Sequence, residues 1–470
     1  MGVPQFFAWL IKHNNTIISN KSFDNVDWLM FDLNCLLHPN VKYILDKNYE
    51  NKTIIENFIL ERIIEHIDDV IKKTNPKNIY CAVDGTVPCG KLNQQRIRRF
   101  KNNSINIVNQ SIDLSTGTPL MEKIHLHLLN YFKNHNINSI YSSYHTPQEG
   151  EHKILHFIKT LTNNNIIIYG LDADLIFLAL TNNGLNNILI MREEQYFHNI
   201  NVDDIQSIVY NYVNINDLKN IIKLKSIDVK DFIIICFLLG NDFIPNILSL
   251  SISGKGIEKI IDAYNKVKNK FKIQLIENNN LNILFLKFLF QELLWTENNV
   301  FSNMTNFDNE HFYYRYYNII DKKSCVLNYI QSLYWCYEYY FNSCISNSFC
   351  YNYYSTPLIK DILKYFPSTI SIPQNLKILN PIEQLILTIP KIYYETVFND
   401  DILCKIKSIE KYIDFLFPTN FQIDNIRSNQ EYKHHPLIPF VDFNFFYKII
   451  KTLNINDNNN MTFNEFVFSK

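Results

Sequence analysis

Short apolar runs rich in Ile, Val, Phe and Tyr alternate with segments of helical periodicity over about the first 250 residues. Each run is short, β-prone and bounded by polar or turn-forming residues, which is typical of strands. The runs lie at 28–31, 79–83, 140–143, 166–169 and 188–191. Helical segments such as 53–73 and 121–134 separate them. This alternation predicts an α/β fold with a mostly parallel central sheet flanked by helices on both faces.

The pattern changes after about residue 251, where helical periodicity and aromatic residues dominate. Segment 281–294 is a strong candidate for an amphipathic helix, whereas 296–321 mixes Asn, Asp and aromatic residues without a period. A second aromatic-rich, mainly helical region follows and is expected to pack on the first. The predicted domains are therefore a core over 1–295, a short linker over 296–322, a second region over 323–452 and a solvated C-terminal tail over 453–470.

Composition limits the possible functions. The formal net charge of the 470 residues is −1, so no overall field attracts nucleic acid and phosphate binding must come from local patches. The nine cysteines form no C-x-x-C pair, which argues against a zinc ribbon or a disulfide framework and favours a reducing compartment. The longest apolar run, 232–239, is too short to cross a bilayer, and the amino terminus lacks signal-peptide features. We expect a cytoplasmic protein without membrane contact, with the nucleus as the alternative.

The stretch 80–101, YCAVDGTVPCGKLNQQRIRRFK, combines a buried strand that ends near Asp84 with a strongly basic segment. The next carboxylate is Asp113, so these cations have no local partners. If 91–100 is helical, four of the side chains share one face because they are spaced by four, seven and eight residues. These four are Lys91, Gln95, Arg98 and Arg99. Guanidinium forks beside an ammonium suit a terminal phosphate; the alternative is a solvated basic helix.

Seven carboxylates in five motifs follow the ends of predicted elements. They are Asp32 in FDLN, Asp84 in VDGT, Glu149 and Glu151 in QEGEH, Asp172 and Asp174 in GLDAD, and Asp242 in GNDF. Any one of them alone is better explained as a helix cap or a turn residue. Together they have a second explanation, because a parallel sheet gathers the residues that follow its strands at one edge.

If these carboxylates converge, cations or protons must relieve their repulsion, which is about 4 kcal/mol for two charges 4 Å apart at an effective dielectric of 20. Oxygen ligands favour Mg²⁺ or Mn²⁺, and two such ions about 3.5–4 Å apart would activate a water and hold both reacting oxygens of a phosphodiester. His152 and His156 are a competing metal pair, but we expect His152 at the edge of the site and His156 facing elsewhere. Metal-dependent glycosyltransferases also contain a DxD motif, but they would not explain the basic helix.

Long strings in this order resemble the XRN family of 5′-to-3′ exoribonucleases. The first conserved region is similar in MGVPQFFAWL, FDLNCLLH, VDGTVPCGKLNQQRIRRF, QEGEHKI, YGLDADLI, MREE and CFLLGNDFIP. The second is similar in YIQSLYWCYEYYFNSC, PIEQLILTIP, IDFLFP and HPLIPFVDF. The resemblance covers nearly the whole chain and predicts a short form without the C-terminal extensions of larger members, which leaves partners that dock on those extensions in doubt.

The resemblance implies a fold related to PIN and flap nucleases, with the second region closing the active site. It implies processive hydrolysis of single-stranded RNA from a 5′-monophosphate end, releasing nucleoside 5′-monophosphates. The seven carboxylates stand where the family's catalytic, metal-binding carboxylates stand. Lys91, Gln95, Arg98 and Arg99 stand at the family's 5′-phosphate pocket.

The same resemblance assigns base stacking to His38, which matches the family's histidine that stacks on the first base. Its usual partner is a tryptophan in an SWSW-type string, but this chain has Ser346-Asn347-Ser348-Phe349 there. Phe349 can still stack over a smaller area, and base stacking contributes about 1–3 kcal/mol. A core position is the alternative for Phe349, and Trp335 is expected in the core.

Two other functions remain open from the sequence. One is a structure-specific endonuclease of the flap or PIN type, which would share the acidic site. The other is a catalytically inactive protein that binds RNA 5′ ends, although no acidic motif position carries a neutral residue. We expect single-stranded RNA as the partner and a monomer, and the sequence identifies no protein partner.

Overall fold

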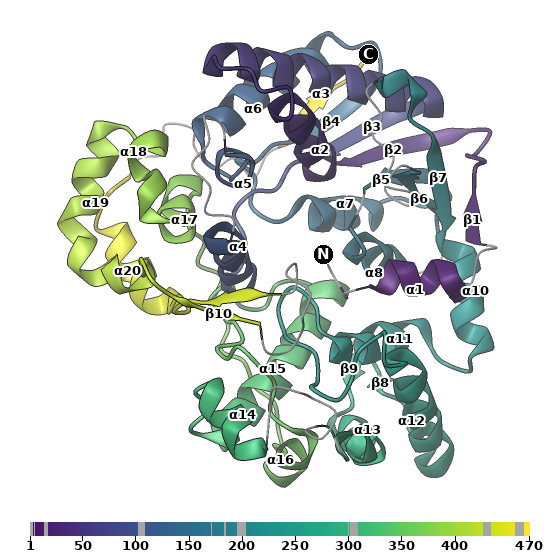
Figure 1. The fold of residues 1–470 in the computed structure, drawn as a ribbon. Helices are drawn as coiled ribbons and strands as arrows, with labels where there is room; N and C mark the ends of the chain where they lie inside the picture. The colour runs from purple at the N-terminus through teal and green to yellow at the C-terminus, as the bar shows by residue number, and fades with distance from the viewer. Residues whose placement is uncertain are drawn as a thin grey trace.

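The computed structural model describes residues 3, 5–13, 17–101, 109–170, 172–182, 185–194, 204–298, 300, 309–425, 434–455 and 465–470, except for the side chain of Ser111. Within this part of the chain, one large sheet has helices on both faces, and two mainly helical groups lie beside it (Figure 1). The predicted fold class, an α/β core with a second, mainly helical region packed on it, is confirmed.

Eight described strands form the main sheet in the order β1-β7-β6-β5-β2-β3-β4-β12. The central five are parallel and correspond to the five predicted runs, two of which extend one residue past the strand: β2 (Val26–Asp32), β3 (Pro76–Ala82), β4 (Asn138–Ser142), β5 (Asn165–Tyr169) and β6 (Asn187–Glu193). Three flanking strands were not predicted: β1 (Ile18–Ser19), β7 (Tyr210–Asn214) and β12 (Phe466–Phe468). β7 is antiparallel to β6, and β12 is antiparallel to β4.

The central strands are apolar along their length because both faces of the sheet are covered. Leu29 and Phe31 pack into one core, whereas Met30 between them packs into the other. The first core is covered by α2 (Leu33–Leu45), α3 (Lys52–Thr74) and α6 (Pro119–Asn134). The second is covered by α1 (Phe6–His13), α7 (Gly150–Ile158), α8 (Asp174–Leu180), α10 (Ile215–Leu224) and α11 (Val229–Cys236).

The order of the strands creates a switch point between β2 and β5. From β2 the chain proceeds to β3 and β4 on one side, and then crosses to β5 and β6 on the other. In open sheets of this kind, ligands bind at the carboxyl ends of the strands beside such a switch point. Asp32 is the last residue of β2, and the segments that follow β3 and β5 carry Asp84 and Asp172.

The first helical group continues the second core of the sheet. It contains η3 (Phe237–Leu239), α12 (Gly256–Phe271), the short β8 (Ile276–Glu277) and β9 (Asn280–Leu281), α13 (Ile283–Leu293), η4 (Leu294–Glu297), α14 (Glu310–Tyr316), α15 (Lys322–Phe341) and α16 (Ile359–Lys364). Helix α15 places Trp335 and Cys336 in the same core as Met30 and Leu175. The predicted helix 281–294 corresponds to α13.

The described part of the predicted linker 296–322 is folded and packed. Tyr313 and Tyr317 of this segment lie in a small core with Leu248 and Leu358. Apart from β12, all described strands of the main sheet precede α10, and mainly helical elements follow from there. The proposed boundaries of the domains remain a prediction, but this connection is not an extended spacer.

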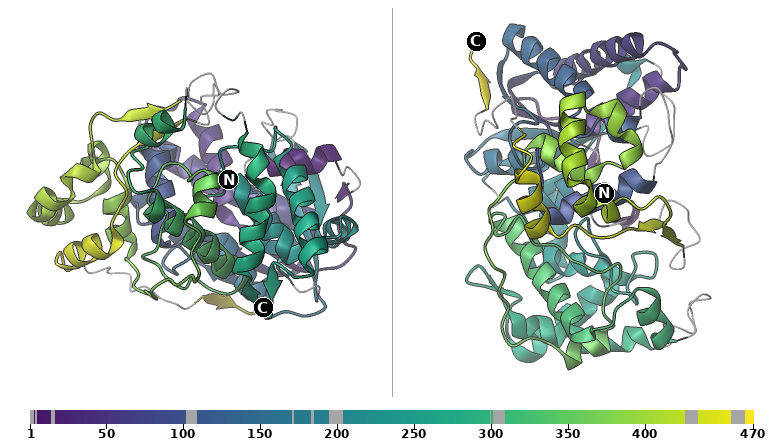
Figure 2. Two further views of the ribbon diagram at one scale, coloured as in Figure 1. Left: turned by 90° about the horizontal axis from the view of Figure 1, so that it is seen from below. Right: turned by 90° about the vertical axis from the view of Figure 1, so that its left-hand side faces the viewer.

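The second helical group lies beside the sheet and is joined to it by α4 (Cys89–Lys101) (Figures 1 and 2). It contains α17 (Pro381–Thr388), η5 (Lys391–Tyr393), α18 (Tyr394–Val397), α19 (Asp400–Ile413), η6 (Asp414–Leu416), β10 (Gln422–Asp424), β11 (His435–Leu437) and α20 (Phe443–Lys451). Leu92 and Phe100 of α4 share its core with Ile386, Ile409 and Phe446. The short α5 (Gln110–Asp113) and η2 (Ile205–Ser207) complete the described helices.

The C-terminal residues differ from the predicted solvated tail. Leu453 and Ile455 are buried in the core of the second helical group. Strand β12 pairs with β4 at the edge of the sheet, and the hydroxyl of Tyr80 donates a hydrogen bond to Glu465. The Asn-rich part of that tail, 456–464, lies outside the described residues. Apolar residues at 453–455 and 466–468 thus find partners far away in the sequence, and the boundary of the tail remains a prediction.

Candidate active site

The seven predicted carboxylates come together at the carboxyl end of the sheet, and each of them interacts electrostatically with another member of the set. Asp32 ends β2, and Asp84 follows β3. Glu149 and Glu151 flank the first residue of α7, Asp172 lies between β5 and α8, and Asp174 is the first residue of α8. Asp242 follows η3, not a strand, after a turn in which Gly240 has φ 85°. The topology thus brings together groups that are more than 200 residues apart.

Gly150 marks the tightest part of this cluster. Its backbone N–H donates to Asp84 Oδ1 at 2.7 Å. A Cβ atom at this position would lie 3.1 Å from Asp32 Oδ1 and 3.4 Å from Asp84 Oδ1. Asp84 is held further by its own N–H, which donates to Asn34 Oδ1 at 3.0 Å. The absence of a side chain at position 150 therefore lets the start of α7 approach both carboxylates.

Burial and mutual repulsion make several of these carboxylates weak acids. Burial, with repulsion from Asp84, raises the pKa of Asp32 to about 7. Burial and neighbouring carboxylates raise the pKa of Asp174 to about 8, and they raise the pKa of Glu151 well above its usual range. Asp174 Oδ1 is also buried without a hydrogen-bond partner among the described residues. An oxygen-only cluster with an unpaired buried oxygen fits a hard divalent cation.

Lys91 supplies a positive charge inside the cluster. Its Nζ forms an ion pair with Glu149 and lies 2.8 Å from Asp242 Oδ2. Burial would lower the pKa of Lys91, but these two carboxylates raise it well above its usual range. Burial would likewise raise the pKa of Asp242, and Lys91 holds it below its usual range. The lysine that sequence reasoning placed among the phosphate ligands thus also links the basic helix to the carboxylates.

The predicted basic face of α4 borders the carboxylates. Arg98 Nη2 lies 3.9 Å from Asp242 Oδ2, and the Arg98 side chain is 41% exposed. Arg99 donates through Nε to Ser115 Oγ at 2.8 Å and through Nη1 to Gln95 Oε1 at 3.2 Å. Burial, together with the charge of Arg98, lowers the pKa of Arg99 to about 9. Two guanidinium groups held side by side form a region that favours an anion.

Arg96 lies on the opposite face of α4 and is 1% exposed. Its guanidinium donates to the backbone oxygens of Pro439 and Leu416, each at 2.5 Å. It also lies against the rings of Phe100 and Phe417. Arg96 therefore connects α4 to the second helical group and does not face the carboxylates, in agreement with the helical periodicity.

The two predicted stacking residues lie near different parts of the basic helix, His38 near Arg98 and Phe349 near its first residues. His38 is exposed on α2, close enough to Arg98 and Asp84 for their charges to affect it. Phe349 is half-buried and stacks on Trp335, with ring centroids 6.4 Å apart and an interplanar angle of 25°. The backbone N–H of Cys89 donates to Asn347 O at 2.8 Å, which fixes the segment of Phe349 at the start of α4.

Sequence reasoning missed several residues that support the site. The hydroxyl of Tyr339 on α15 donates to Glu149 Oε2 at 2.8 Å, and its ring stacks on Trp335. Lys153 donates to the carbonyls of Val83 and Ser143 at 2.7 and 2.8 Å, and so joins the ends of β3 and β4. Nothing in the local sequence identifies these partners, because each contact joins distant segments.

The nearby histidines lie as the sequence suggested. His152 is buried against the ring of Tyr339, with ring centroids 3.9 Å apart. One potential ligand atom from each of His152, Glu149 and Glu151 lies within 4.8 Å of the other two. His156 faces away, with Nδ1 3.1 Å from Gln148 Oε1. Only His152 is close enough to the carboxylates to share a cation with them.

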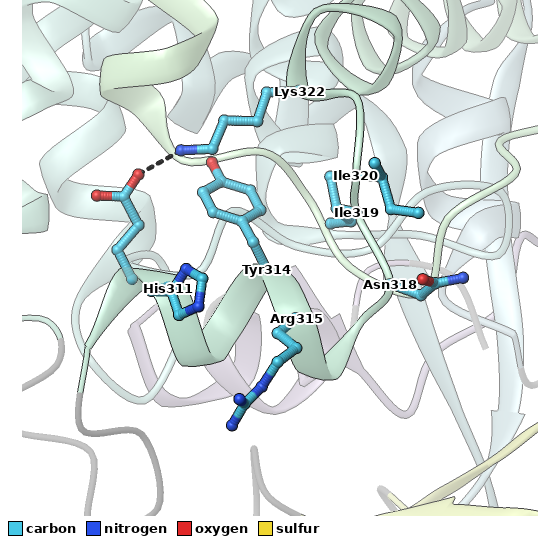
Figure 3. Close-up of a pocket in the computed structure, with 8 residues that line it drawn as sticks. His311, Tyr314, Arg315, Asn318, Ile319, Ile320 and Lys322 are labelled. Carbon is cyan, nitrogen blue, oxygen red and sulfur yellow. Dashed lines mark hydrogen bonds and ion pairs between the residues drawn. The ribbon is translucent and has the colours of Figure 1, made fainter.

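A separate pocket of about 530 Å³ lies between α14 and the start of α15 (Figure 3). It is lined by Glu310, His311, Tyr314, Arg315, Asn318, Ile319, Ile320 and Lys322, and an ion pair joins Glu310 to Lys322. None of the predicted site residues lines it. Over the described ranges, no helix combines the length and apolar character that a membrane span requires.

Sequence comparisons identify the class of protein. The model described as XRN 5'-3' exonuclease N-terminus matches residues 1–194, and the Xrn1 helical domain matches 223–315 and 305–462. Because these matches cover most of the chain, the protein belongs to the XRN family.

Particular relatives carry the name 5'-3' exoribonuclease. Exoribonuclease 1 of Schizosaccharomyces pombe is 27% identical, over 64% of this chain and 26% of the relative. The human exoribonuclease 1 is 24% identical over 97% of this chain and 34% of its own length. Exoribonuclease 2 of Debaryomyces hansenii is 25% identical over 64% of this chain and 39% of the relative. The chain thus spans less than half the length of these relatives.

Among solved structures, the T5 D15 protein co-crystallised with metal ions aligns with 59% of this chain and 91% of that chain. The TM-score is 0.32 and the sequence identity is 12%.

Proposed function

We propose that the protein is a metal-dependent 5′-to-3′ exoribonuclease that acts on single-stranded RNA with a 5′-monophosphate and releases nucleoside 5′-monophosphates processively. One observation carries the proposal: the carboxylate cluster and the basic face of α4 are joined directly, through the contacts of Lys91 with Glu149 and Asp242. A site that cuts beside a terminal phosphate needs these two features side by side. The names of the relatives support the same activity.

In this proposal, the seven carboxylates hold Mg²⁺ or Mn²⁺, as two ions. They are Asp32, Asp84, Glu149, Glu151, Asp172, Asp174 and Asp242. When bound, the ions would lower the pKa of a water and stabilise the charge that develops on the phosphate. Lys91 and Tyr339 orient Glu149, and Gly150 keeps Asp32 and Asp84 close together.

The basic face of α4 would bind the 5′-monophosphate. Arg98 is the most accessible of its cations, and Arg99 is held beside it by Gln95 and Ser115. Guanidinium groups bind phosphate oxygens in pairs and in a fixed plane, so a preorganised set favours one anion size. His38 and Phe349 would stack on the first base, with the protein acting as a monomer.

The test compares three RNAs of the same sequence that carry a monophosphate, a triphosphate or a hydroxyl at the 5′ end. We expect the monophosphate substrate to be degraded at least 10-fold faster than the other two. The hydroxyl substrate lacks the charged hydrogen bonds, which contribute about 1.5–3 kcal/mol each, and the triphosphate is too large for a pocket that favours one anion size. Equal decay of all three would refute the phosphate pocket.

Two further measurements separate the proposal from its alternatives. A circular RNA has no 5′ end, so its cleavage would indicate an endonuclease. Calorimetric titration with Mg²⁺ and Mn²⁺ should show binding that Asp174→Asn weakens. A protein that binds 5′-monophosphate RNA but neither ion would be an end-binding protein without nuclease activity.

A further inference from the structure

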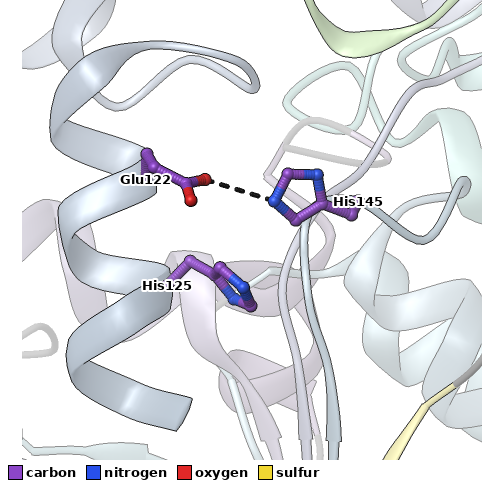
Figure 4. A group of neighbouring side chains, drawn as sticks. All are labelled: Glu122, His125 and His145. Atoms are coloured by element: carbon purple, nitrogen blue, oxygen red, sulfur yellow. Dashed lines mark hydrogen bonds and ion pairs between the residues drawn. The ribbon is translucent and has the colours of Figure 1, made fainter. Parts of the chain in front are cut away.

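A second group of potential metal ligands lies outside the carboxylate cluster, where α6 meets the loop that follows β4 (Figure 4). It consists of Glu122 and His125, one turn apart on α6, and His145 from the loop. One ligand atom of each residue lies within 4.8 Å of the others, and His145 Nε2 is 3.2 Å from Glu122 Oε2. Both histidines are 6% exposed, whereas the side chain of Glu122 is 31% exposed.

Two tyrosines form hydrogen bonds with these potential ligands. The hydroxyl of Tyr141 is 3.2 Å from His125 Nδ1, and the hydroxyl of Tyr144 donates to Glu122 Oε2. The ring of Tyr144 also lies against the ring of His145, with centroids 4.0 Å apart. Metal-binding histidines and carboxylates are typically oriented by such outer hydrogen bonds, which fix the tautomer and the direction of the ligand atom.

A simple ion pair explains only part of this arrangement. The hydrogen bond from His145 lowers the pKa of Glu122 to about 2, as expected for a carboxylate paired with a histidine. His125 is different, because it is buried and forms no ion pair with a carboxylate among the described residues. Its Nε2 forms no hydrogen bond within the described part of the chain. With Nδ1 donating to Tyr141, Nε2 presents a lone pair, which is the form that binds metals.

The geometry points to a metal site formed by Glu122, His125 and His145, and we propose that it binds a divalent ion of the zinc class. Adjacent ligand atoms on a tetrahedral zinc lie about 3.3 Å apart, given bonds of about 2.0–2.1 Å. The separation between Glu122 Oε2 and His145 Nε2 already matches this value. The ion would replace the proton that Nε2 donates to Glu122, which is released to solvent, and a small movement of His125 would complete the set. Two imidazoles and one carboxylate are a common zinc ligand set and leave the fourth position for water. The partly exposed Glu122 gives the ion an entry path.

This site would select a different ion from the carboxylate cluster. Imidazole nitrogen favours Zn²⁺ and Co²⁺, whereas a set of carboxylate oxygens suits Mg²⁺ and Mn²⁺. The two sites can therefore be filled independently, and excess Mg²⁺ should not displace an ion from the histidines.

The position of the site indicates a structural role. His145 lies four residues before Glu149, in a loop that pairs with the segment after β3: Gly85 N–H donates to Gln148 O, and Gln148 N–H donates to Thr86 O, both at 2.8 Å. An ion shared by α6 and this loop would hold the start of α7, which carries Glu149 and Glu151. It would stabilise the fold without contacting the reacting groups.

The test is titration of the full chain with Co²⁺ in excess Mg²⁺, followed by visible absorption. We expect one Co²⁺ per chain with the bands of a nitrogen-ligated ion in low coordination. His125→Asn and Glu122→Gln should each weaken binding at least 10-fold. Asp174→Asn is the matched control in the other site and should leave this Co²⁺ bound. Zn²⁺ should raise the melting temperature of the wild type and of Asp174→Asn, but not that of His125→Asn.

Tyr141→Phe tests the outer hydrogen bond without removing a ligand, and we expect about 10-fold weaker binding. Near-UV circular dichroism shows whether each variant folds. If a ligand variant does not fold, Co²⁺ binding by Tyr141→Phe still tests the proposed site. Three results would overturn the proposal: no Co²⁺ bound in excess Mg²⁺, binding that is unchanged in His125→Asn, or binding that is lost in His152→Asn instead. The first would leave an ion pair between Glu122 and His145, and the third would place the ion beside Glu149.

Discussion

The two faces of α4 carry the same kinds of side chain in opposite environments. On one face, Arg98 is partly exposed and approaches the carboxylate of Asp242. On the other, Arg96 is buried and donates to two backbone carbonyls of the second helical group. Among the described residues Arg96 forms no ion pair. Only two positions in the sequence separate these guanidiniums, yet one lines the candidate site and the other stabilises the interface between two parts of the molecule.

This difference shows that neighbouring basic residues of one cluster can have different roles. A helix places residues two positions apart about 200° from each other, so the face decides the role. The buried face attaches α4 to the second helical group, and this attachment fixes the direction of the exposed face. The variants that follow separate the contributions of the two faces.

The largest effect is expected from a change that removes the proposed chemistry and leaves both faces of α4 intact. Asp174→Asn should lower RNA hydrolysis by about 10³-fold or more, or ~4 kcal/mol, because it removes a charged metal ligand. RNA binding, measured by fluorescence anisotropy, should be unchanged, since α4 is unaltered. The exposed carboxylate of Asp262 on α12 provides the control, and Asp262→Asn should be as active as the wild type. Turnover retained in Asp174→Asn would remove this residue from the site.

Arg96→Met tests the buried face. We expect the free energy of unfolding, measured with urea, to fall by about 2–3 kcal/mol, because two buried carbonyl oxygens lose their donor. The loss of a buried charge offsets part of this cost. The rate of hydrolysis per folded molecule should be unchanged, because Arg96 does not face the carboxylates. Full stability together with reduced activity would contradict the division between the faces.

Much of the fold could be predicted because it depends on local pattern. The five central strands are continuous apolar runs, and runs of this kind are required where both faces of a sheet are covered. β1 and β12 were missed because edge strands of two or three residues have no reliable pattern. β12 also pairs with a strand more than 300 residues earlier in the chain, which no local signal indicates.

The part of the candidate site that follows from the strand pattern could be predicted, whereas contacts between distant segments could not. Asp32, Asp84 and Asp172 were expected together because parallel strands end at one edge. The pairing of Lys91 with Glu149 and Asp242 was not expected, because it depends on the distance between α4, α7 and the turn after η3. Their assigned roles in catalysis and phosphate binding remain predictions until the variants are measured.

Arg98→Met is the matched substitution on the exposed face. We expect kcat/KM for RNA with a 5′-monophosphate to fall about 10–100-fold, which corresponds to about 1.4–2.7 kcal/mol for a charged hydrogen bond. The same measurement with 5′-hydroxyl RNA should change little, since that substrate lacks the phosphate. The free energy of unfolding should stay within about 0.5 kcal/mol of the wild type, as for most exposed positions. An equal loss on both substrates would show that Arg98 acts elsewhere on the RNA.

The smallest expected effect is a change in the free energy of unfolding with pH, and it must be measured on metal-free protein. The pKa values of Asp32 and Asp174, about 7 and about 8, lie above the value near 4 of an unfolded Asp. Above about pH 4 the unfolded state has released these protons, whereas the folded state still holds them up to about pH 7 and pH 8. The stabilisation that the bound protons provide is therefore lost as pH rises through 7 and 8. We expect the free energy of unfolding to fall by about 1–2 kcal/mol from pH 7 to pH 8.

Two variants and one ion would identify the source of this slope. Asp174→Asn should flatten it, because the amide does not titrate. Arg96→Met should shift the whole curve without changing its slope, because burial lowers the pKa of Arg96 only to about 10 and the group stays charged over this range. Mg²⁺ should restore stability at pH 8, since bound cations replace the protons. A slope that Arg96→Met abolishes and Asp174→Asn preserves would assign the titration to the buried face of α4 and not to the carboxylates.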